Sequence, residues 1–116
     1  DPDASEKLIA TFRAKARPPA AVCMDDALAI GLTGLLKGMG LDVPGDLSIV
    51  SFNNTDAGKY HIPALTSFEI DPYRLGMSAM PLMADVLKGT MDAPRSIEVP
   101  FTLIERDSVG DAPASE

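Results

Sequence analysis

Three short runs of apolar and strand-favouring residues, separated by segments with helical periodicity, constrain the fold of this chain more than any other feature. The runs cover residues 20–24, 47–52 and 65–70, and a weaker alternating run covers 97–104. Nearly continuous apolar strands are typical of a parallel sheet that helices cover on its faces. We therefore expect three buried strands and a last strand at the edge of the sheet.

Apolar residues recur at helical spacing in three other segments. They predict helices over residues 4–16, 27–38 and 73–88, and the polar stretch 53–60 is expected to be a connection. Pro18 and Pro19 stop the first helix, because the residue before a proline is disfavoured in the α region. The resulting order, helix–strand–helix–strand–strand–helix–strand, predicts an α/β fold with a mainly parallel sheet and flanking helices.

Polar side chains follow each of the three expected parallel strands. In open α/β sheets, ligands bind outside the carboxyl ends of the strands. We therefore expect these strand ends to form one rim, where a small pocket can be built. The rim residues are Asp25, Asp26, Asn53, Asn54, Ile70 and Asp71.

The neighbouring carboxylates Asp25 and Asp26 allow more than one interpretation. A metal site would need further carboxylate or imidazole ligands, and His61 is the only histidine. Adjacent residues at a strand end also tend to point apart, so an acid–base pair is disfavoured. One of the two can cap the following helix while the other is solvated. We expect Asp26 either to cap the helix or to be solvated, and Asp25 to lie over the rim.

Composition excludes several classes of function. The formal net charge is −7, with ten basic residues scattered among seventeen acidic ones, so direct nucleic-acid binding by this segment is not expected. No apolar run approaches the ~20 residues of a membrane span. Cys23 is the only cysteine and lies in an apolar run, so we expect a buried thiol. A single unpaired cysteine is compatible with a reducing cytoplasm. We find no nucleophile, dinucleotide or phosphate-loop motif, and expect no enzyme, metal or cofactor.

Five short motifs, in order, together resemble the effector-binding domain of LacI/GalR-type transcription regulators. They are AVCMDDALAIG at 21–31, GLDVPGDLSIVSFNN at 40–54, PALTS at 63–67, Leu75-Gly76, and a closing segment from Val99 to Ser108 with LIERDS at 103–108. The resemblance covers residues 20–108. Each motif is weak alone, and their order and spacing make the resemblance specific.

The resemblance implies the C-terminal subdomain of a type I periplasmic-binding-protein-like fold. Residues 1–71 would be its core, 72–90 a crossover helix packed on the other subdomain, 91–109 a return strand and 110–116 a loose tail. The helix-turn-helix that reads DNA and the other wall of the ligand cleft are expected to lie outside this sequence. The implied function is sensing of a small sugar-like effector in the cytoplasm, and the alternative is a periplasmic sugar-binding protein of a transport system.

Site residues follow from the resemblance one position at a time. The implied ligand contacts are Asp25, Asn53, Ile70 and Pro72. Where the family has asparagine this chain has Asp25, and where the family has aspartate it has Asn53. Ile70 takes a place that is often glutamine. A carboxylate and an amide can still bind a polyol together, so we expect a changed effector.

The resemblance also implies a homodimer. Its contacts would come from the second helix and from the loop before the PALTS motif, namely Ile30, Gly34, Lys37, Tyr60, His61 and Ile62. Separately, the long third helix has an apolar stripe that needs a partner. Its residues are Leu75, Ala79, Leu82, Met83 and Val86. Without the sheet that it would cover, we expect this stripe to pack elsewhere or to cause association.

Overall fold

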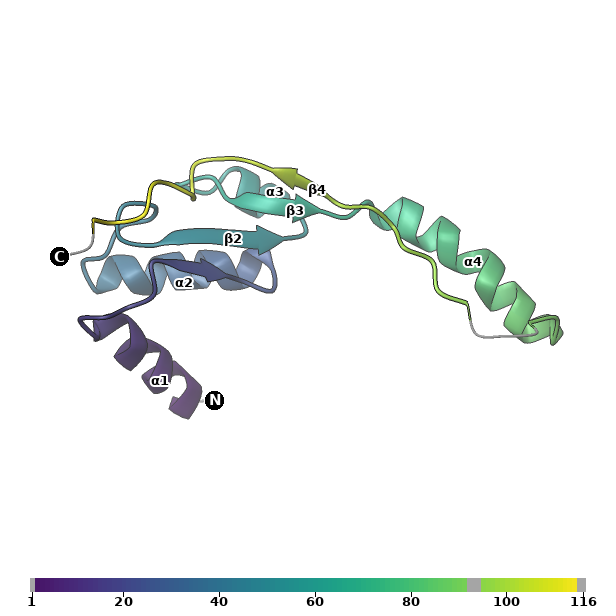
Figure 1. Cartoon of the computed structure of the whole chain (residues 1–116), viewed down its shortest axis with the longest axis horizontal. Helices are drawn as coiled ribbons and strands as arrows, with labels where there is room; N and C mark the ends of the chain where they lie inside the picture. Colours follow the sequence, from purple (N-terminus) through teal and green to yellow (C-terminus); the bar gives the residue numbers. More distant parts are fainter. Residues whose placement is uncertain (1, 92–94, 115–116) are drawn as a thin grey trace.

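A four-stranded sheet forms the centre of the computed structural model, which describes residues 2–91 and 95–114. The strands are β1 (Ala20–Val22), β2 (Ser48–Phe52), β3 (Thr66–Glu69) and β4 (Thr102–Ile104), and they lie side by side in that order. β1, β2 and β3 run parallel, and β4 pairs antiparallel with β3 at the edge. The prediction of a mainly parallel sheet is confirmed (Figure 1).

Four helices connect or flank these strands. They are α1 (Pro2–Arg13), α2 (Asp26–Gly38), α3 (Asp56–Lys59) and α4 (Pro72–Lys88). The helix predicted over 4–16 is displaced towards the N-terminus, because α1 begins at Pro2 and ends at Arg13. The polar stretch 53–60, predicted to be a connection, contains the short helix α3. The strand predicted over 97–104 is wrong in part, since only its last three residues face a partner strand.

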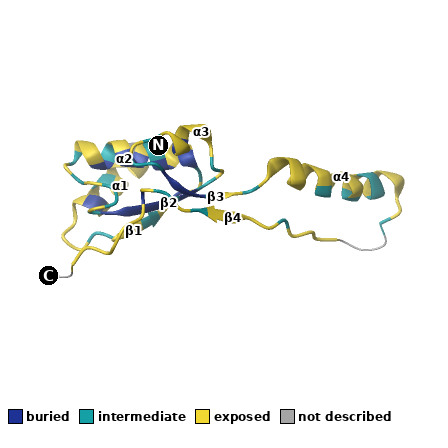
Figure 2. Ribbon diagram, turned by 90° about the horizontal axis from the view of Figure 1, so that it is seen from above, coloured by how far each residue is buried: buried dark blue, intermediate teal, exposed yellow. Residues whose placement is uncertain are grey.

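The hydrophobic core lies on one face of the sheet, under α2. Ile49 from β2 and Leu65 just before β3 are fully buried there against Ala29 and Leu36 of α2. Figure 2 shows α2 and α3 on the same side of the sheet. The rest of the buried hydrophobic cluster consists of Phe12, Cys23, Leu32 and Leu47. The burial of Cys23 confirms the expected buried thiol.

The opposite face of the sheet carries aromatic and aliphatic side chains that no described helix covers. Phe52 and Phe68 are partners in the register of β2 and β3, and their rings stack with centroids 5.0 Å apart. Phe101 meets Phe68 edge-on at 5.2 Å. Val22 on β1 remains 73% exposed. Side chains alternate along a strand, so this face differs from the core face although both belong to the same strands.

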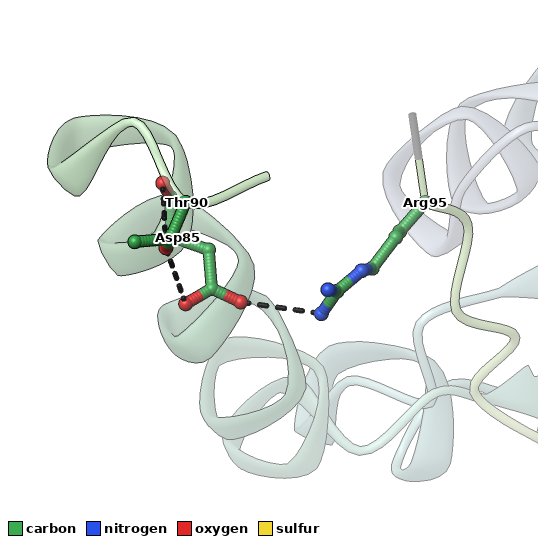
Figure 3. A network of polar contacts seen from close by, with 3 residues as sticks. All are labelled: Asp85, Thr90 and Arg95. Atoms are coloured by element: carbon green, nitrogen blue, oxygen red, sulfur yellow. Dashed lines mark hydrogen bonds and ion pairs between the residues drawn. The ribbon is translucent and has the colours of Figure 1, made fainter. Parts of the chain in front are cut away.

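α4 and the segment that returns from it project from the sheet as an arm, here defined as the described residues of 72–101 (Figure 1). The remaining described residues are called the body. Asp71 caps α4 by accepting from the amides of Tyr73 and Arg74, and Gly89 ends the helix with a φ of 69°. Arg95 donates to Asp85 across 3.2 Å, and Thr90 also contacts Asp85 (Figure 3).

No residue of α4 is buried. The molecule is elongated as a result, with extents of 60 × 30 × 25 Å. No helix among the described residues has the length and apolar character to cross a bilayer.

Candidate functional site

The carboxyl ends of β1, β2 and β3 meet at one edge of the sheet, as their parallel register requires. Asp25 follows β1 and is half-buried, and Asn53 follows β2 and is exposed. Ile70 follows β3 and is half-buried, while Pro72 is the first residue of α4 and is exposed. The four predicted ligand contacts therefore lie on the connections that leave this edge, the rim.

The two neighbouring aspartates have roles that differ from those expected. Asp25 is the N-cap of α2, and its Oδ1 accepts from the amide of Leu28 at 2.7 Å. Asp26 is neither a cap nor solvated, because only 1% of its surface is exposed. The expectation for Asp26 is therefore wrong. Asp25 combines the cap with its place at the rim, since only one of its carboxylate oxygens is needed for the cap.

Asp26 binds three hydroxyl-bearing residues, and we call these four residues the Asp26 cluster. Its Oδ1 accepts from the hydroxyl of Ser51 and, at 2.9 Å, from that of Ser67. Its Oδ2 accepts from the amide and the hydroxyl of Thr55, at 2.6 and 2.7 Å. One carboxylate thus joins the start of α2 to β2, to β3 and to the start of α3.

The Asp26 carboxylate is kept ionised by these donors. Burial alone would raise the pKa of Asp26, because a charge is poorly solvated inside a protein. The hydrogen bonds from Ser51, Thr55 and Ser67 together outweigh this effect, and the pKa lies below its ordinary value. Among the described residues, no buried side-chain nitrogen or oxygen lacks a hydrogen-bond partner. The cluster is therefore a satisfied structural support beneath the rim.

Gly58 lets α3 approach this carboxylate closely. A Cβ atom at position 58 would lie 2.6 Å from Oδ2 of Asp26, which is closer than side chains tolerate. Thr55 caps α3 by accepting from the amide of Gly58 at 3.2 Å. The same threonine hydroxyl therefore serves α3 and Asp26, and it fixes the chain just after Asn53 and Asn54.

Ser108, which follows β4, links β2 to the start of β3 through its side chain. Its side chain is fully buried, donates to the carbonyl of Ile49 at 2.6 Å and accepts from the amide of Thr66 at 2.8 Å. Ile49 donates its own amide to the carbonyl of Ser108 at 2.8 Å. Ser108 of the closing motif thus holds the two central strands of the sheet together.

The predicted dimer residues lie on α2 and on the loop after α3. Gly34 and Lys37 are exposed, and a Cβ atom at Gly34 would meet nothing within 4 Å. Tyr60 is 74% and Ile62 91% exposed. Two further residues are half-buried: Ile30 packs partly against the core, and His61 contacts the carbonyl of Pro63 through Nδ1 at 2.9 Å.

At the rim, Asn53 and Pro72 are exposed and Asp25 and Ile70 are half-buried. Two surface hollows lie elsewhere, one along residues 98–101 and one between α1 and the end of α2 at Phe12, Arg17 and Met39. Neither is lined by the predicted ligand contacts. Within the ranges 2–91 and 95–114, no group of three or more histidine, cysteine or acidic residues is placed to hold a metal ion.

Comparison with known families identifies the family to which this domain belongs. The model of the periplasmic binding protein-like domain matches residues 2–109. The chain belongs to this family. Among curated relatives, it is 38% identical over 99 residues to the HTH-type transcriptional repressor PurR of Erwinia tasmaniensis, covering 85% of this chain and 29% of the repressor.

Solved structures of LacI-type regulators agree with this assignment. A transcriptional regulator LacI from Bacillus cereus subsp. cytotoxis is 29% identical, with a TM-score of 0.78 over 93% of this chain and 37% of that one. A LacI family regulator from Enterococcus faecium with bound ribose is 26% identical, with a TM-score of 0.72 over 94% of this chain and 40% of that one. The predicted resemblance to a LacI/GalR-type effector-binding domain is confirmed.

In this LacI/GalR-type domain, sequence reasoning found the rim but missed the support beneath it. Ser51, Thr55 and Ser67 were not singled out, and Asp26 was misassigned. Their signal is weak in the sequence: one serine in each of two neighbouring strands, at positions that only the parallel register makes adjacent. Asn54 and Arg106, which contact each other, were also missed as partners.

Proposed function

We propose that this chain is the ligand-sensing part of a LacI/GalR-type transcription regulator and that its rim binds a small hydroxyl-rich molecule. The observation that carries the proposal is the pair of polar side chains at neighbouring strand ends, Asp25 after β1 and Asn53 after β2. The Enterococcus faecium relative has ribose bound, which supports a sugar or sugar derivative.

The chemistry of the two side chains suits adjacent hydroxyls. A carboxylate accepts hydrogen bonds, and an amide both donates and accepts. Each charge-assisted bond contributes about 1.5–3 kcal/mol net to binding. Ile70 gives the rim an apolar corner, and Pro72 begins α4 next to it. A ligand with vicinal hydroxyls and one apolar edge fits this combination.

The chain spans about 29% of the curated repressor's length, so the activity of the whole protein is part of the proposal. A net charge of −7 makes this segment a poor partner for phosphate, and DNA binding is assigned to a helix-turn-helix elsewhere in the polypeptide. We assign it a regulatory role in the cytoplasm, without catalysis, and a homodimeric assembly. Transport is the less supported alternative, since the curated relative is a repressor.

Titration calorimetry of the intact parent protein with D-ribose and D-glucose tests the ligand. Asp25→Asn keeps the cap, because asparagine caps helices as well as aspartate does, but it removes the charge. We expect binding to weaken about tenfold or more, as the loss of a charge-assisted bond implies. Asp56→Asn, at the first residue of α3, is the matched control and should bind normally. Unchanged affinity in Asp25→Asn would remove Asp25 from the site.

The dimer is tested separately by sedimentation of the intact protein. Ile62→Asp places a charge on the most exposed apolar residue of the predicted contact and should shift the protein towards monomer. Val109→Asp introduces the same charge on another exposed residue, outside the contact, and should not. A dimer that is indifferent to Ile62→Asp would place the interface elsewhere.

A further inference from the structure

The chain turns through an uncommon backbone conformation immediately after β2. Asn53 has a φ of 94° and Asn54 a φ of 46°, and these are the described non-glycine residues with positive φ. Asparagine tolerates the left-handed region better than most residues, but two in succession need support from their surroundings. Asn53 is also a predicted ligand contact, so whatever supports this turn also sets the position of a site residue.

Asn54 is held by three partners. Its amide donates to the hydroxyl of Ser67 at 3.0 Å, and its side-chain Nδ2 donates to Glu69 Oε1 at 3.2 Å. Its Oδ1 accepts from Nη2 of Arg106 at 2.5 Å. Both the backbone and both ends of the side-chain amide are thus engaged, which leaves Asn54 little freedom to leave its conformation.

Arg106 is itself fixed against β3. Its Nη1 donates to the carbonyl of Leu65 at 2.9 Å, and its backbone amide donates to Oγ1 of Thr66 at 2.9 Å. The residue is half-buried, so these contacts are only partly open to water. A guanidinium that binds a backbone carbonyl and a side-chain amide at once acts as a rigid fork.

Asn53 is different from its neighbour. Its amide donates to the carbonyl of Phe68 at 2.8 Å, which continues the parallel ladder by one residue. Within the described part of the chain its side chain makes no hydrogen bond, and the residue is exposed. The side-chain amide of Asn53 therefore lies next to Asn54, whose backbone and side chain are both hydrogen-bonded.

We infer that Arg106 and Asn54 are positioning residues: they hold the turn after β2 so that the side chain of Asn53 faces the ligand in one orientation. The inference rests on the proposed function, because it assigns a purpose to the conformation of a proposed ligand contact. Arg106 lies beyond β4 and 52 residues from Asn54 in the sequence, so the closing segment of the chain takes part in shaping the rim.

Nuclear magnetic resonance of the labelled full chain tests this directly. A positive φ brings the amide and α protons of one residue close, which gives a strong intraresidue Overhauser effect. We expect this effect at Asn53 and Asn54 in the unmodified chain, and its loss in Arg106→Ala. Arg106→Lys, which keeps the charge but not the fork, should lose it in part. Asn54→Gly in the Arg106→Ala background should restore it at position 53, since glycine adopts positive φ without strain.

Arg17→Ala is the matched control. Arg17 is also partly exposed and bonds to Asp46 at 2.9 Å, away from the rim. Its removal should leave the signals of Asn53 and Asn54 unchanged. If Arg106→Ala does not fold, Asn54→Ala removes the other half of the contact and gives the same readout. Retention of the strong effects at both asparagines in the folded variant would overturn the inference.

Addition of D-ribose to the labelled intact parent protein, unmodified and with Arg106→Ala, separates this inference from the proposed function. Ribose-dependent shifts at Asn53 that Arg106→Ala abolishes, together with loss of the positive-φ signature, support both. If the unmodified protein instead shows the positive-φ Overhauser effects at Asn53 and Asn54 but no chemical-shift change with D-ribose or D-glucose, Arg106 and Asn54 still position the turn. That result counts against the sugar ligand alone.

Discussion

α2 in the body and α4 in the arm are both periodic helices, yet they differ in what they bury. α2 has 13 residues and buries five of them: Asp26, Ala29, Leu32, Thr33 and Leu36. α4 has 17 residues and buries none. An amphipathic pattern predicts that a helix forms, but most helical stability in proteins comes from the surface on which the apolar face packs. The difference shows that periodicity identifies the helix and leaves its partner unspecified.

Removal of the Asp26 carboxylate should produce the largest contrast between body and arm. Asp26→Ala leaves the buried hydroxyls of Ser51 and Ser67, and also Thr55, without their common acceptor, and we expect a loss of about 3–5 kcal/mol in the free energy of unfolding. Asp85→Ala, which breaks the exposed pair with Arg95, should cost about 1 kcal/mol or less. Urea denaturation followed by circular dichroism measures both. Equal costs would break the comparison.

Truncation of leucines should give the next largest contrast. Leu36 is fully buried in α2, whereas Leu87 in α4 is 80% exposed. Leu36→Ala should cost about 2–5 kcal/mol, because it leaves a cavity in the core. Leu87→Ala should remain within about 0.5 kcal/mol of the unmodified chain. The same denaturation experiment decides this, and a large cost for Leu87→Ala would show that the arm packs against something in solution.

Acid should weaken the body through Asp26. The pKa of this carboxyl is lowered in the folded state, so its contribution to stability is fully present above the ordinary value of 3.8 and is lost as the pH falls through the folded pKa. Unfolding curves at successive pH values below 5 should show a decline that is smaller in Asp26→Asn, which has no charge to lose. Parallel declines in both proteins would assign the acid sensitivity to other groups.

Substitutions in the apolar stripe of the arm should have the smallest effect on stability. They should, however, measurably change self-association. Met83 and Val86 of the predicted stripe are 59% and 56% exposed. Replacing both with glutamate should leave the free energy of unfolding nearly unchanged, while it reduces self-association of the full chain in sedimentation and lowers binding of the dye ANS. Gly110→Ala is not a suitable control, because a Cβ atom there would crowd Pro44. Lys88→Glu, on the same helix outside the stripe, is suitable. A monomer without dye binding before any substitution would contradict the expectation.

Much of the fold could be predicted from the sequence because local patterns specify it. The three parallel strands and α2 and α4 lie within two residues of the ranges expected from apolar runs and caps. α3 was missed because four residues are too few to show a period, although Thr55 before Asp56 is a capping pattern. The last strand was overpredicted, since alternation favours a strand but cannot supply the neighbour that residues 97–101 lack among the described residues.

The rim was predictable and its support was not, for a related reason. Asp25, Asn53 and Ile70 follow strands, and a parallel sheet brings such positions together whatever lies between them. The partners of Asp26 are 25, 29 and 41 residues away, and only the register of the strands places them at one carboxylate. The roles of the rim and dimer residues in binding stay predictions, as does the division into subdomains.

The Asp26 cluster also acts as a check on how the strands align while the chain folds. Side chains alternate between the two faces, so a slip of one residue in β2 would bring Val50 or Phe52 to the carboxylate in place of Ser51, and a slip in β3 can bring Phe68 there in place of Ser67. The misaligned sheet would contain a buried charge without its donors, at a cost of several kcal/mol. One buried aspartate thus adds a polar requirement to the hydrophobic pattern that sets the alignment of two short strands.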